Sequence, residues 1–321
     1  MKTKKIASLF LAAVLLAASV LAFPACSGNP DNPGTKTEKD VSIVAREQGS
    51  GTREAFDTVV TDGTHFLQEK DENGKKRFYT AKSASELNST GAVLSAVASD
   101  PNAIGYISLG SVNDTIRVLQ VGGVLPSKET VLSGTYKIQR PFVVMTKKDQ
   151  TLTPLTADFL AYLESNEAEA HCESAGTIFL TDPAKRANEG ETGITVSGYT
   201  KQAALPAGDK IIVRGSTSMD KLIHAAAKGY ATLYGVSADK IFDIQLEGSS
   251  VGRKAVEQDT VGNTIGLSSA AVKQSNIRSF NICLDAVAVI VNRENTTVSN
   301  LTLAQLYDIF TGKIKKFSEI G

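Results

Sequence analysis

The sequence contains no tryptophan, and aromatic residues make up only 6% of its 321 positions. Sugars and other ligands that stack on aromatic rings therefore suit this chain poorly. A net charge is also missing, because 34 lysines and arginines offset 34 aspartates and glutamates. Without a large basic field we expect no nucleic-acid partner. Any charged ligand has to be bound by a local site.

Signals for metals and nucleotides are equally scarce. The three histidines, His65, His171 and His224, are not spaced as metal ligands, and no Walker sequence follows an apolar run. Ser218 and Lys221 have the Ser-x-x-Lys spacing of serine acyl-transfer enzymes, but the companion Lys-Thr-Gly and Ser-Asp-Asn triplets are absent. We therefore expect neither a metal nor a cofactor, and no enzymatic activity.

Only three cysteines are present, and the first of them, Cys26, follows a secretory signal. Lysines near the N-terminus precede an apolar stretch from Ile6 to Phe23, and small residues then lead to Cys26. Residues 1–25 resemble a bacterial lipoprotein signal peptide, which would leave Cys26 as the lipid-carrying first residue. An uncleaved membrane anchor is the alternative. Residues 26–40, rich in Pro, Gly, Asn and Thr, predict a flexible tether.

The other two cysteines are Cys172 and Cys283. Two cysteines of an exported chain can pair, but nothing in their spacing demands it, and Cys283 lies in an apolar run. We expect thiols that are unpaired or only incidentally paired.

The most informative stretch is 46–56, which follows the apolar run 41–45 and indicates a strand, a glycine turn and a helix start. The first N–H groups of a helix have no intrahelical partner and carry partial positive charge, so they attract an anion. The candidates for contact with the anion are two glycines, two hydroxyl residues and two arginines, whose guanidinium groups can bind an oxyanion through two bonds. They are Gly49, Gly51, Ser50, Thr52, Arg46 and Arg53. The alternative interpretation is a serine-capped helix with solvated arginines.

The same order of strand, small-hydroxyl loop and helix recurs along the chain. The later loops are Gly215-Ser216-Thr217-Ser218, Gly248-Ser249-Ser250 and Ser268-Ser269. In open α/β sheets, ligands bind beyond the carboxyl ends of the strands, where such loops gather. A chain of 321 residues is long enough for two domains of this class. The sequence therefore predicts an α/β fold with a site for an oxyanion.

Taken together, these motifs resemble the phosphate-binding proteins of bacterial phosphate ABC transporters. Three motifs resemble the second half of the sequences of those proteins. They are Arg46-x-x-Gly49-Ser50-Gly51-Thr52-Arg53, Pro101-Asn102-Ala103-Ile104-Gly105-Tyr106-Ile107-Ser108 and Gly134-Thr135-Tyr136-x-x-x-Arg140-Pro141-Phe142. Four other motifs resemble the first half of those sequences. They are Gly215-Ser216-Thr217-Ser218, Gly248-Ser249-Ser250, Ala286-Val287-Ala288-Val289-Ile290-Val291-Asn292 and Leu301-Thr302-x-x-Gln305-Leu306-x-x-Ile309-Phe310-Thr311-Gly312-Lys313-Ile314. The similarity covers nearly all of 41–321.

The two halves stand in the reverse of the family's usual order. This is the arrangement expected of a circular permutation, in which the nearly core-free stretch 182–208 is a linker that joins the family's usual termini. The resemblance implies a periplasmic-binding-protein-like fold of type II, with two α/β domains and a ligand cleft between them. We expect the chain to cross between the domains near 138–140 and near 285–289.

Each implied domain follows from these crossings. One domain comprises residues 41–137 plus 289–321 and carries the Arg-Gly-Ser-Gly-Thr loop. The other comprises residues 138–288.

Carried over residue by residue, the family's site corresponds to eight residues of this chain. They are Arg46, Ser50, Gly51 and Thr52 on one wall, and Thr217, Ser218, Ser249 and Ser269 on the other. Ser218 stands where some members have an aromatic residue. Ser269 stands where some members have a carboxylate that accepts the proton of hydrogen phosphate. Because a carboxylate repels an anion that brings no proton, its loss predicts weaker discrimination against sulfate. Glu247 is a substitute acceptor or a solvated surface residue.

The resemblance implies an extracytoplasmic solute-binding lipoprotein. It would be a monomer, anchored to the cell membrane through Cys26, that captures inorganic phosphate and delivers it to the permease subunits of an ABC transporter. One alternative is a lipoprotein that uses the same fold for sensing phosphate or for adhesion. Another is binding of a different oxyanion, such as sulfate, molybdate or a phosphate ester.

Overall fold

The computed structural model describes residues 39–188 and 194–320. The predicted signal peptide, Cys26 and residues 26–38 of the predicted tether lie outside the described residues. Within the described ranges, no helix combines the length and the apolar character needed to span a bilayer.

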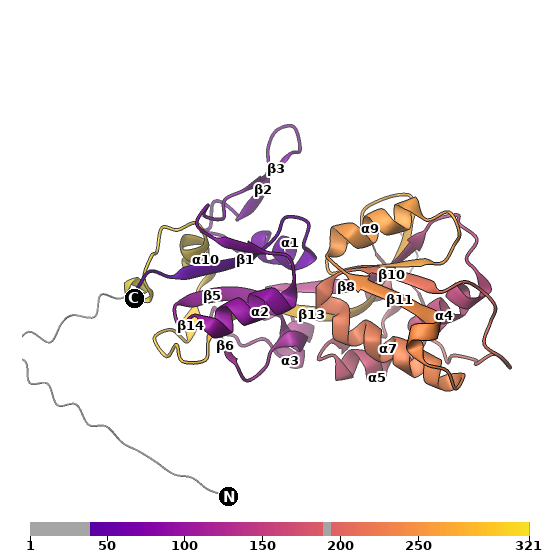
Figure 1. The fold of residues 1–321 in the computed structure, drawn as a ribbon. Coiled ribbons are helices and arrows are strands. Elements are labelled where there is room, and N and C mark those ends of the chain that lie inside the picture. The colour runs from indigo at the N-terminus through magenta and orange to yellow at the C-terminus, as the bar shows by residue number, and fades with distance from the viewer. Residues whose placement is uncertain (1–38, 189–193, 321) are drawn as a thin grey trace, which may run out of the picture. The chain divides into compact units, whose positions relative to one another are not determined.

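A ten-stranded mixed sheet forms the centre of the fold (Figure 1). Eight strands follow one another in the order β11-β10-β12-β8-β13-β5-β1-β4, while β6 and β9 pair with β13 off this path. The outer strands pair in parallel, and β8 and β13 pair antiparallel with their neighbours. The strands are β1 (Ser42–Arg46), β4 (Ser85–Leu87), β5 (Ala103–Ser108), β6 (Ile116–Val118), β8 (Gln139–Lys147), β9 (Ile178–Phe179), β10 (Ile211–Gly215), β11 (Phe242–Leu246), β12 (Thr264–Ser268) and β13 (Ile277–Asn292).

Two small sheets stand beside the large one. A hairpin of β2 (Gln68–Lys70) and β3 (Lys76–Phe78) projects from the body of the protein, and β7 (Gln120–Val121) pairs in parallel with β14 (Asn300–Leu301). The helices are α1 (Gly51–Asp57), α2 (Thr90–Ser99), α3 (Lys128–Leu132), α4 (Pro154–Glu164), α5 (Ala168–Ser174), α6 (Pro183–Arg186), α7 (Asp220–Leu233), α8 (Ala238–Ile241), α9 (Ser249–Gln258) and α10 (Leu303–Phe310), with short 3₁₀ turns η1 (Leu109–Ser111), η2 (Thr217–Met219) and η3 (Phe317–Glu319).

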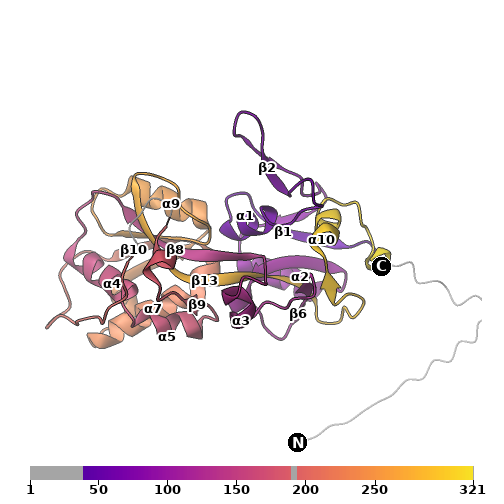
Figure 2. The same cartoon turned by 180° about the vertical axis from the view of Figure 1, so that it is seen from behind.

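The alternation of side chains along the strands explains why helices cover both faces of the sheet. On β13, Val287 and Val289 pack on the face covered by α1 and α10, whereas Ala288 and Ile290 pack on the face covered by α2. The β10–β12 end of the sheet is likewise covered by α9 on one face and by α7 on the other (Figures 1 and 2).

Each end of the sheet has its own hydrophobic core. The first lobe is built around β1 and β5, where Phe56 and Tyr106 are buried. The second lobe is built around β10 and β12, where Phe159 and Tyr230 are buried. Residues 39–321 form one compact unit by their contacts. The boundaries of the two domains therefore stay a prediction, which the separate cores support.

The strands β8 and β13 connect the two lobes (Figure 2). They pair directly, with Arg140 opposite Asp285 in the register, and these two residues form a buried ion pair with Nη2 and Oδ2 2.9 Å apart. The Ser108 hydroxyl donates to the other oxygen of Asp285 at 2.8 Å. The two segments at which the sequence predicted the crossings therefore lie side by side.

The stretch 182–208 is attached to the second lobe at several points. Arg186, on α6, is completely buried and donates to the carbonyl of Leu180 at 3.1 Å. Farther on, the Tyr199 hydroxyl donates to Asp158 of α4 at 2.6 Å. In the described part of the stretch only Arg186 and Asn188 are buried, and most other positions are exposed. Its role as a linker stays a prediction.

The cysteines Cys172 on α5 and Cys283 on β13 are both free and buried in the core of the second lobe. Burial raises the pKa of Cys283 well above its usual range. The expectation of unpaired thiols is confirmed, and both side chains act as small hydrophobic residues.

Candidate anion-binding cleft

The loop between β1 and α1 has the conformation of a capped helix start. The Ser50 hydroxyl accepts hydrogen bonds from the backbone N–H groups of Thr52 at 3.2 Å and of Arg53 at 3.4 Å. Gly49 has a φ of 102°, a conformation that side chains with a Cβ rarely adopt. Because Ser50 already accepts two bonds, its own O–H remains available as a donor.

Three loops of the second lobe each contribute a serine, and two of these serines are hydrogen-bonded to the third, Ser269. Ser216, after β10, donates to the hydroxyl of Ser269 at 2.8 Å. Ser249, the first residue of α9, lies 3.2 Å from the same hydroxyl and accepts from the backbone N–H of Ser269 at 3.0 Å. All three residues are buried.

The two lobes meet at these loops, with α1 next to α9 (Figure 1). The hydroxyl oxygens of Thr52 and Ser218 are 3.0 Å apart, and the N–H of Ser250 donates to the carbonyl of Gly49 at 3.3 Å. A Cβ atom on Gly51 would lie 2.5 Å from the carbonyl carbon of Ser269. The glycine is therefore what allows the first loop to approach the second lobe this closely.

We call the hydroxyl side chains gathered at this seam the hydroxyl cluster. Its members are Ser50, Thr52, Thr90, Ser216, Thr217, Ser218, Ser249 and Ser269. The structure thus brings together the predicted hydroxyl residues of both walls and Gly51. Among the described residues, no carboxylate is bonded to a hydroxyl of the cluster.

Arg46 lies beside the cluster and is 2% exposed. Its guanidinium forms a bidentate ion pair with Glu47, in which Nε and Nη2 lie 2.9 Å and 3.0 Å from the two carboxylate oxygens. The remaining nitrogen, Nη1, donates to the Thr90 hydroxyl at 3.4 Å. Tyr106, whose pKa burial raises, fixes the backbone of Arg46 by accepting its N–H at 3.2 Å. Arg46 therefore offers one edge of its guanidinium to the cluster, while Glu47 holds the other.

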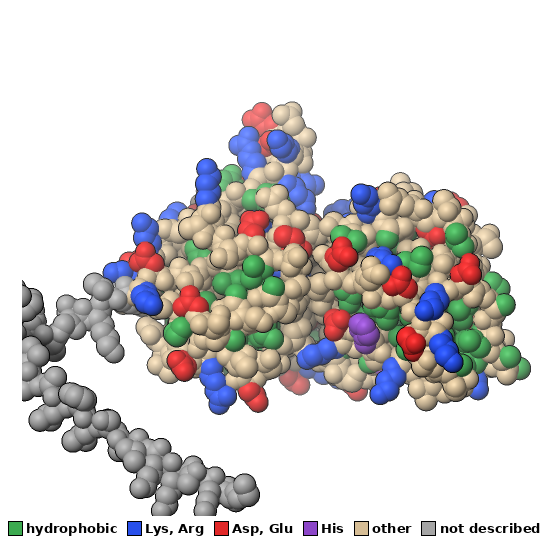
Figure 3. Space-filling view, viewed as in Figure 1, with side chains coloured by type: hydrophobic (Ala, Val, Ile, Leu, Met, Phe, Trp, Pro, Cys, Tyr) green, Lys and Arg blue, Asp and Glu red, His purple; other side chains and the backbone are tan. Residues whose placement is uncertain are grey.

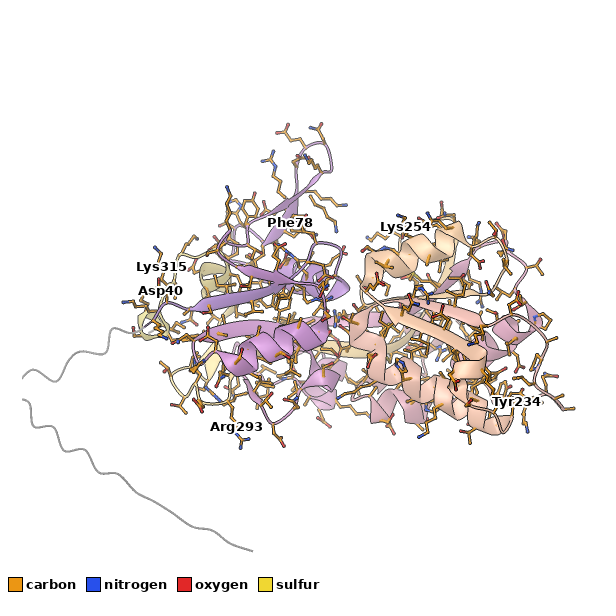
Figure 4. All side chains as sticks on the ribbon, viewed as in Figure 1. Asp40, Phe78, Tyr234, Lys254, Arg293 and Lys315 are labelled. Carbon is orange, nitrogen blue, oxygen red and sulfur yellow. The ribbon has the colours of Figure 1, made fainter. Side chains whose placement is uncertain are left out.

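Arg53 does not face the cluster, so the expectation that it offers a fork to an anion is wrong. Its Nε donates to Asp57 at 3.0 Å, and its Nη1 donates to Glu86 at 2.6 Å and to the carbonyl of Arg46 at 2.8 Å. The guanidinium also lies 5.0 Å from the ring centroid of Phe78, at the base of the β2–β3 hairpin (Figure 4). Arg53 supports the strand that carries Arg46.

Asp57, the partner of Arg53, is almost completely buried, and one of its carboxylate oxygens has no partner. Burial raises its pKa from 3.8 to about 6, although the charge of Arg53 opposes this effect. The carboxylate therefore titrates nearer neutral pH than an exposed aspartate.

Thr90 was not among the predicted site residues. It opens α2, and its hydroxyl lies 3.2 Å from that of Thr217 and 3.3 Å from that of Ser218. The sequence Asn88-Ser89-Thr90 before an apolar helix carries the same signal as the other loops. Glu247, the candidate acceptor, is exposed and outside the cluster.

The cluster is suited to binding rather than to catalysis. It offers hydroxyl donors, the starts of several helices and one arginine edge, which together favour a small acceptor-rich anion. Over the described ranges, no His, Cys, Asp and Glu side chains gather in a way that could hold a metal ion. On the face seen in Figure 3, basic and acidic side chains are interspersed. The positive character of the site is therefore local.

Residues 29–167 and 200–321 match the model of the PBP superfamily domain, so the chain belongs to the PBP superfamily. The whole chain is 35% identical to the phosphate-binding protein PstS 2 of Streptococcus pneumoniae serotype 4 and 32% identical to that of Streptococcus agalactiae serotype V, over the full length of both relatives. Within the superfamily it belongs to the PstS family of phosphate-binding proteins, a family of binding proteins rather than enzymes.

A solved structure supports the same assignment. It is the crystal structure of a phosphate-binding protein of a phosphate ABC transporter from Streptococcus pneumoniae TIGR4. The similarity covers 88% of this chain and all of the other, with 34% identity and a TM-score of 0.61.

Proposed function

We propose that this protein captures inorganic phosphate in the cleft between its lobes and delivers it to the permease subunits of a phosphate ABC transporter. The observation that carries the proposal is the convergence of hydroxyls from both lobes beside the edge of Arg46. The proposed ligand-binding residues are Arg46, Ser50, Gly51, Thr52, Thr217, Ser218, Ser249 and Ser269. The names of the relatives support phosphate as the ion.

The expected affinity follows from the number of charge-assisted bonds. Each contributes on the order of 1.5–3 kcal/mol, and a micromolar complex requires about 8 kcal/mol. Several such bonds reach this value after the costs of ordering and desolvation. Because the cluster contains residues of both lobes, the full set of bonds to the ion forms only when the lobes approach each other. Closure would also exclude water and strengthen each bond.

We propose that the chain is a circular permutant of the family's usual order. The N–H of Val41 donates to the carbonyl of Lys315 at 2.7 Å, and Asp40 and Lys315 lie together in Figure 4. A continuous chain could therefore run from 315 into β1, as the usual order requires. The stretch 182–208, attached to the second lobe, would replace the family's termini.

We also propose that the protein is extracytoplasmic and is held at the membrane by a lipid on Cys26. The sequence of residues 1–26 supports this proposal. Cys26→Ser should release the protein from membranes. Membrane association that persists in the variant would favour an uncleaved anchor instead.

The binding proposal is tested by a thermal-shift screen over phosphate, sulfate, molybdate and phosphate esters. Phosphate should raise the melting temperature of the full mature protein, because it binds the folded state only. A shift with another anion and none with phosphate would overturn the assignment of the ion. Transporter genes beside this gene would favour delivery over sensing.

A further inference from the structure

We propose that Thr90 contacts the bound anion, and that Arg46 orients its hydroxyl as a donor toward the ion. The inference rests on the proposed function and extends its ligand set to α2. Thr90 is 6% exposed. Its hydroxyl oxygen lies within hydrogen-bond distance of Arg46, Thr217 and Ser218, and so of both lobes.

The direction of these bonds follows from their chemistry. A guanidinium can only donate, so the bond between Arg46 Nη1 and Thr90 Oγ1 uses a lone pair of the threonine oxygen. The proton of the Thr90 hydroxyl is then free to point to the second lobe. In addition, the backbone N–H of Thr90 donates to Thr217 Oγ1 at 3.2 Å, which leaves the Thr217 hydroxyl as a donor too.

The same logic applies around the cluster. Ser50 and Ser249 accept backbone N–H groups, so each can donate its own O–H. Ser216 accepts the N–H of Ser218 at 3.3 Å and donates its O–H to Ser269, which leaves the Ser269 hydroxyl as a donor. Thr52 and Ser218 bond to each other at 3.0 Å. With Thr90, the cluster is mainly a set of donors, which is complementary to an anion whose oxygens are all acceptors.

A purely structural role for Thr90 predicts different behaviour. The cap of α2 is Ser89, whose hydroxyl accepts the N–H of Ala92 at 3.1 Å. The Thr90 hydroxyl makes no capping bond, so the helix start does not depend on it. Removing the hydroxyl should therefore weaken ligand binding without loosening α2.

The test compares phosphate binding by calorimetry for the wild-type protein, Thr90→Val and Thr90→Ser. Valine keeps the branched shape but has no hydroxyl, and serine keeps the hydroxyl. We expect Thr90→Val to bind phosphate about tenfold or more weakly, and Thr90→Ser to stay within about threefold of wild type. All three phosphate-free proteins should fold, with a melting temperature for Thr90→Val that is lowered only by the loss of the bond from Arg46 Nη1 and of those to Thr217 and Ser218.

Two control variants separate binding from folding. Thr156→Val makes the same change at a buried threonine in the first turn of α4, where the hydroxyl bonds to Thr153. It should leave phosphate affinity unchanged. Ser89→Ala removes the cap of α2. It should lower the melting temperature and change the phosphate affinity of the folded protein much less than Thr90→Val does. If Thr90→Val does not fold, Thr90→Ala serves in its place.

The outcomes are distinct. If the wild-type protein does not bind phosphate, the proposed function fails. If wild type binds and Thr90→Val binds equally well, the role of Thr90 fails alone. A loss in Thr90→Ser as large as in Thr90→Val would also overturn it, because the hydroxyl would then not be the group that matters.

Discussion

Thr52 and Ser218 are 166 positions apart in the sequence, and their hydroxyl oxygens lie 3.0 Å apart at the seam between the two lobes. Both residues are buried, and buried polar groups need hydrogen-bond partners. An anion at this place would accept a hydrogen bond from each hydroxyl, so two charge-assisted bonds would replace one neutral bond. In this way the affinity for an anion is linked to the approach of the lobes.

Arg46→Ala should weaken phosphate binding at least tenfold, because it removes the guanidinium edge that contacts the hydroxyl cluster at Thr90. The fold should persist, since Glu47, its partner, is partly exposed and can be hydrated. Calorimetry measures the affinity and circular dichroism the fold. Arg214→Ala is a suitable control, because Arg214 pairs with Asp243 at the surface. Unchanged affinity in Arg46→Ala would remove Arg46 from the site.

Gly51→Ala should abolish tight phosphate binding while leaving each lobe folded. The added Cβ would lie 2.5 Å from the backbone of Ser269, and backbone atoms cannot yield cheaply. The lobes would then be held apart at the point where the cluster closes. Gly198→Ala is the control, because a Cβ there meets nothing within 4 Å. Wild-type affinity in Gly51→Ala would show that the close approach is not needed for binding.

Much of this site could be predicted because its residues are of unusual kinds in a repeated order. Glycines next to Ser or Thr after strand-like runs mark Ser50, Thr217 and Ser249 without any knowledge of the fold. The direction in which a side chain points could not be predicted in this way, because its partners in the tertiary structure determine it. Arg53 was predicted to face an anion, but Asp57 and Glu86 hold it on the other side.

Thr90 was missed for a related reason. Its loop follows β4, a strand of only three residues that is neither strongly apolar nor clearly periodic. The strand pairs with β1, and only this pairing brings the start of α2 to the end of β1. Sequence patterns report which face of an element is buried, but not which strands become neighbours.

Sulfate should compete with phosphate, because no carboxylate is bonded to the hydroxyls of the cluster among the described residues. Ser269→Asp restores an acidic side chain and should weaken sulfate binding much more than phosphate binding near neutral pH. Ser269→Asn has the same size without the charge and controls for crowding near Gly51. A competition titration measures both anions. If a large excess of sulfate displaces no phosphate from the wild-type protein, the role assigned to the missing carboxylate is wrong.

Asp57 should make the stability of the protein depend on pH. Its pKa is about 6 in the folded protein and 3.8 in an exposed chain, because burial disfavours the carboxylate. Between these values the folded state binds more protons than the unfolded state, so the free energy of unfolding falls as the pH rises from about 4 to about 6. The loss amounts to roughly 3 kcal/mol if no other group compensates.

Asp57→Asn tests this directly, because asparagine can still accept the bond from Arg53 but does not titrate. Urea denaturation at pH 4 and pH 7 should show a smaller decrease in stability for Asp57→Asn than for wild type. Asp209→Asn, at an exposed position, should behave as wild type. Equal decreases in wild type and Asp57→Asn would mean that the Arg53 pair keeps Asp57 ionised across the whole range. In that case the support of Arg46 by Arg53 would be independent of pH.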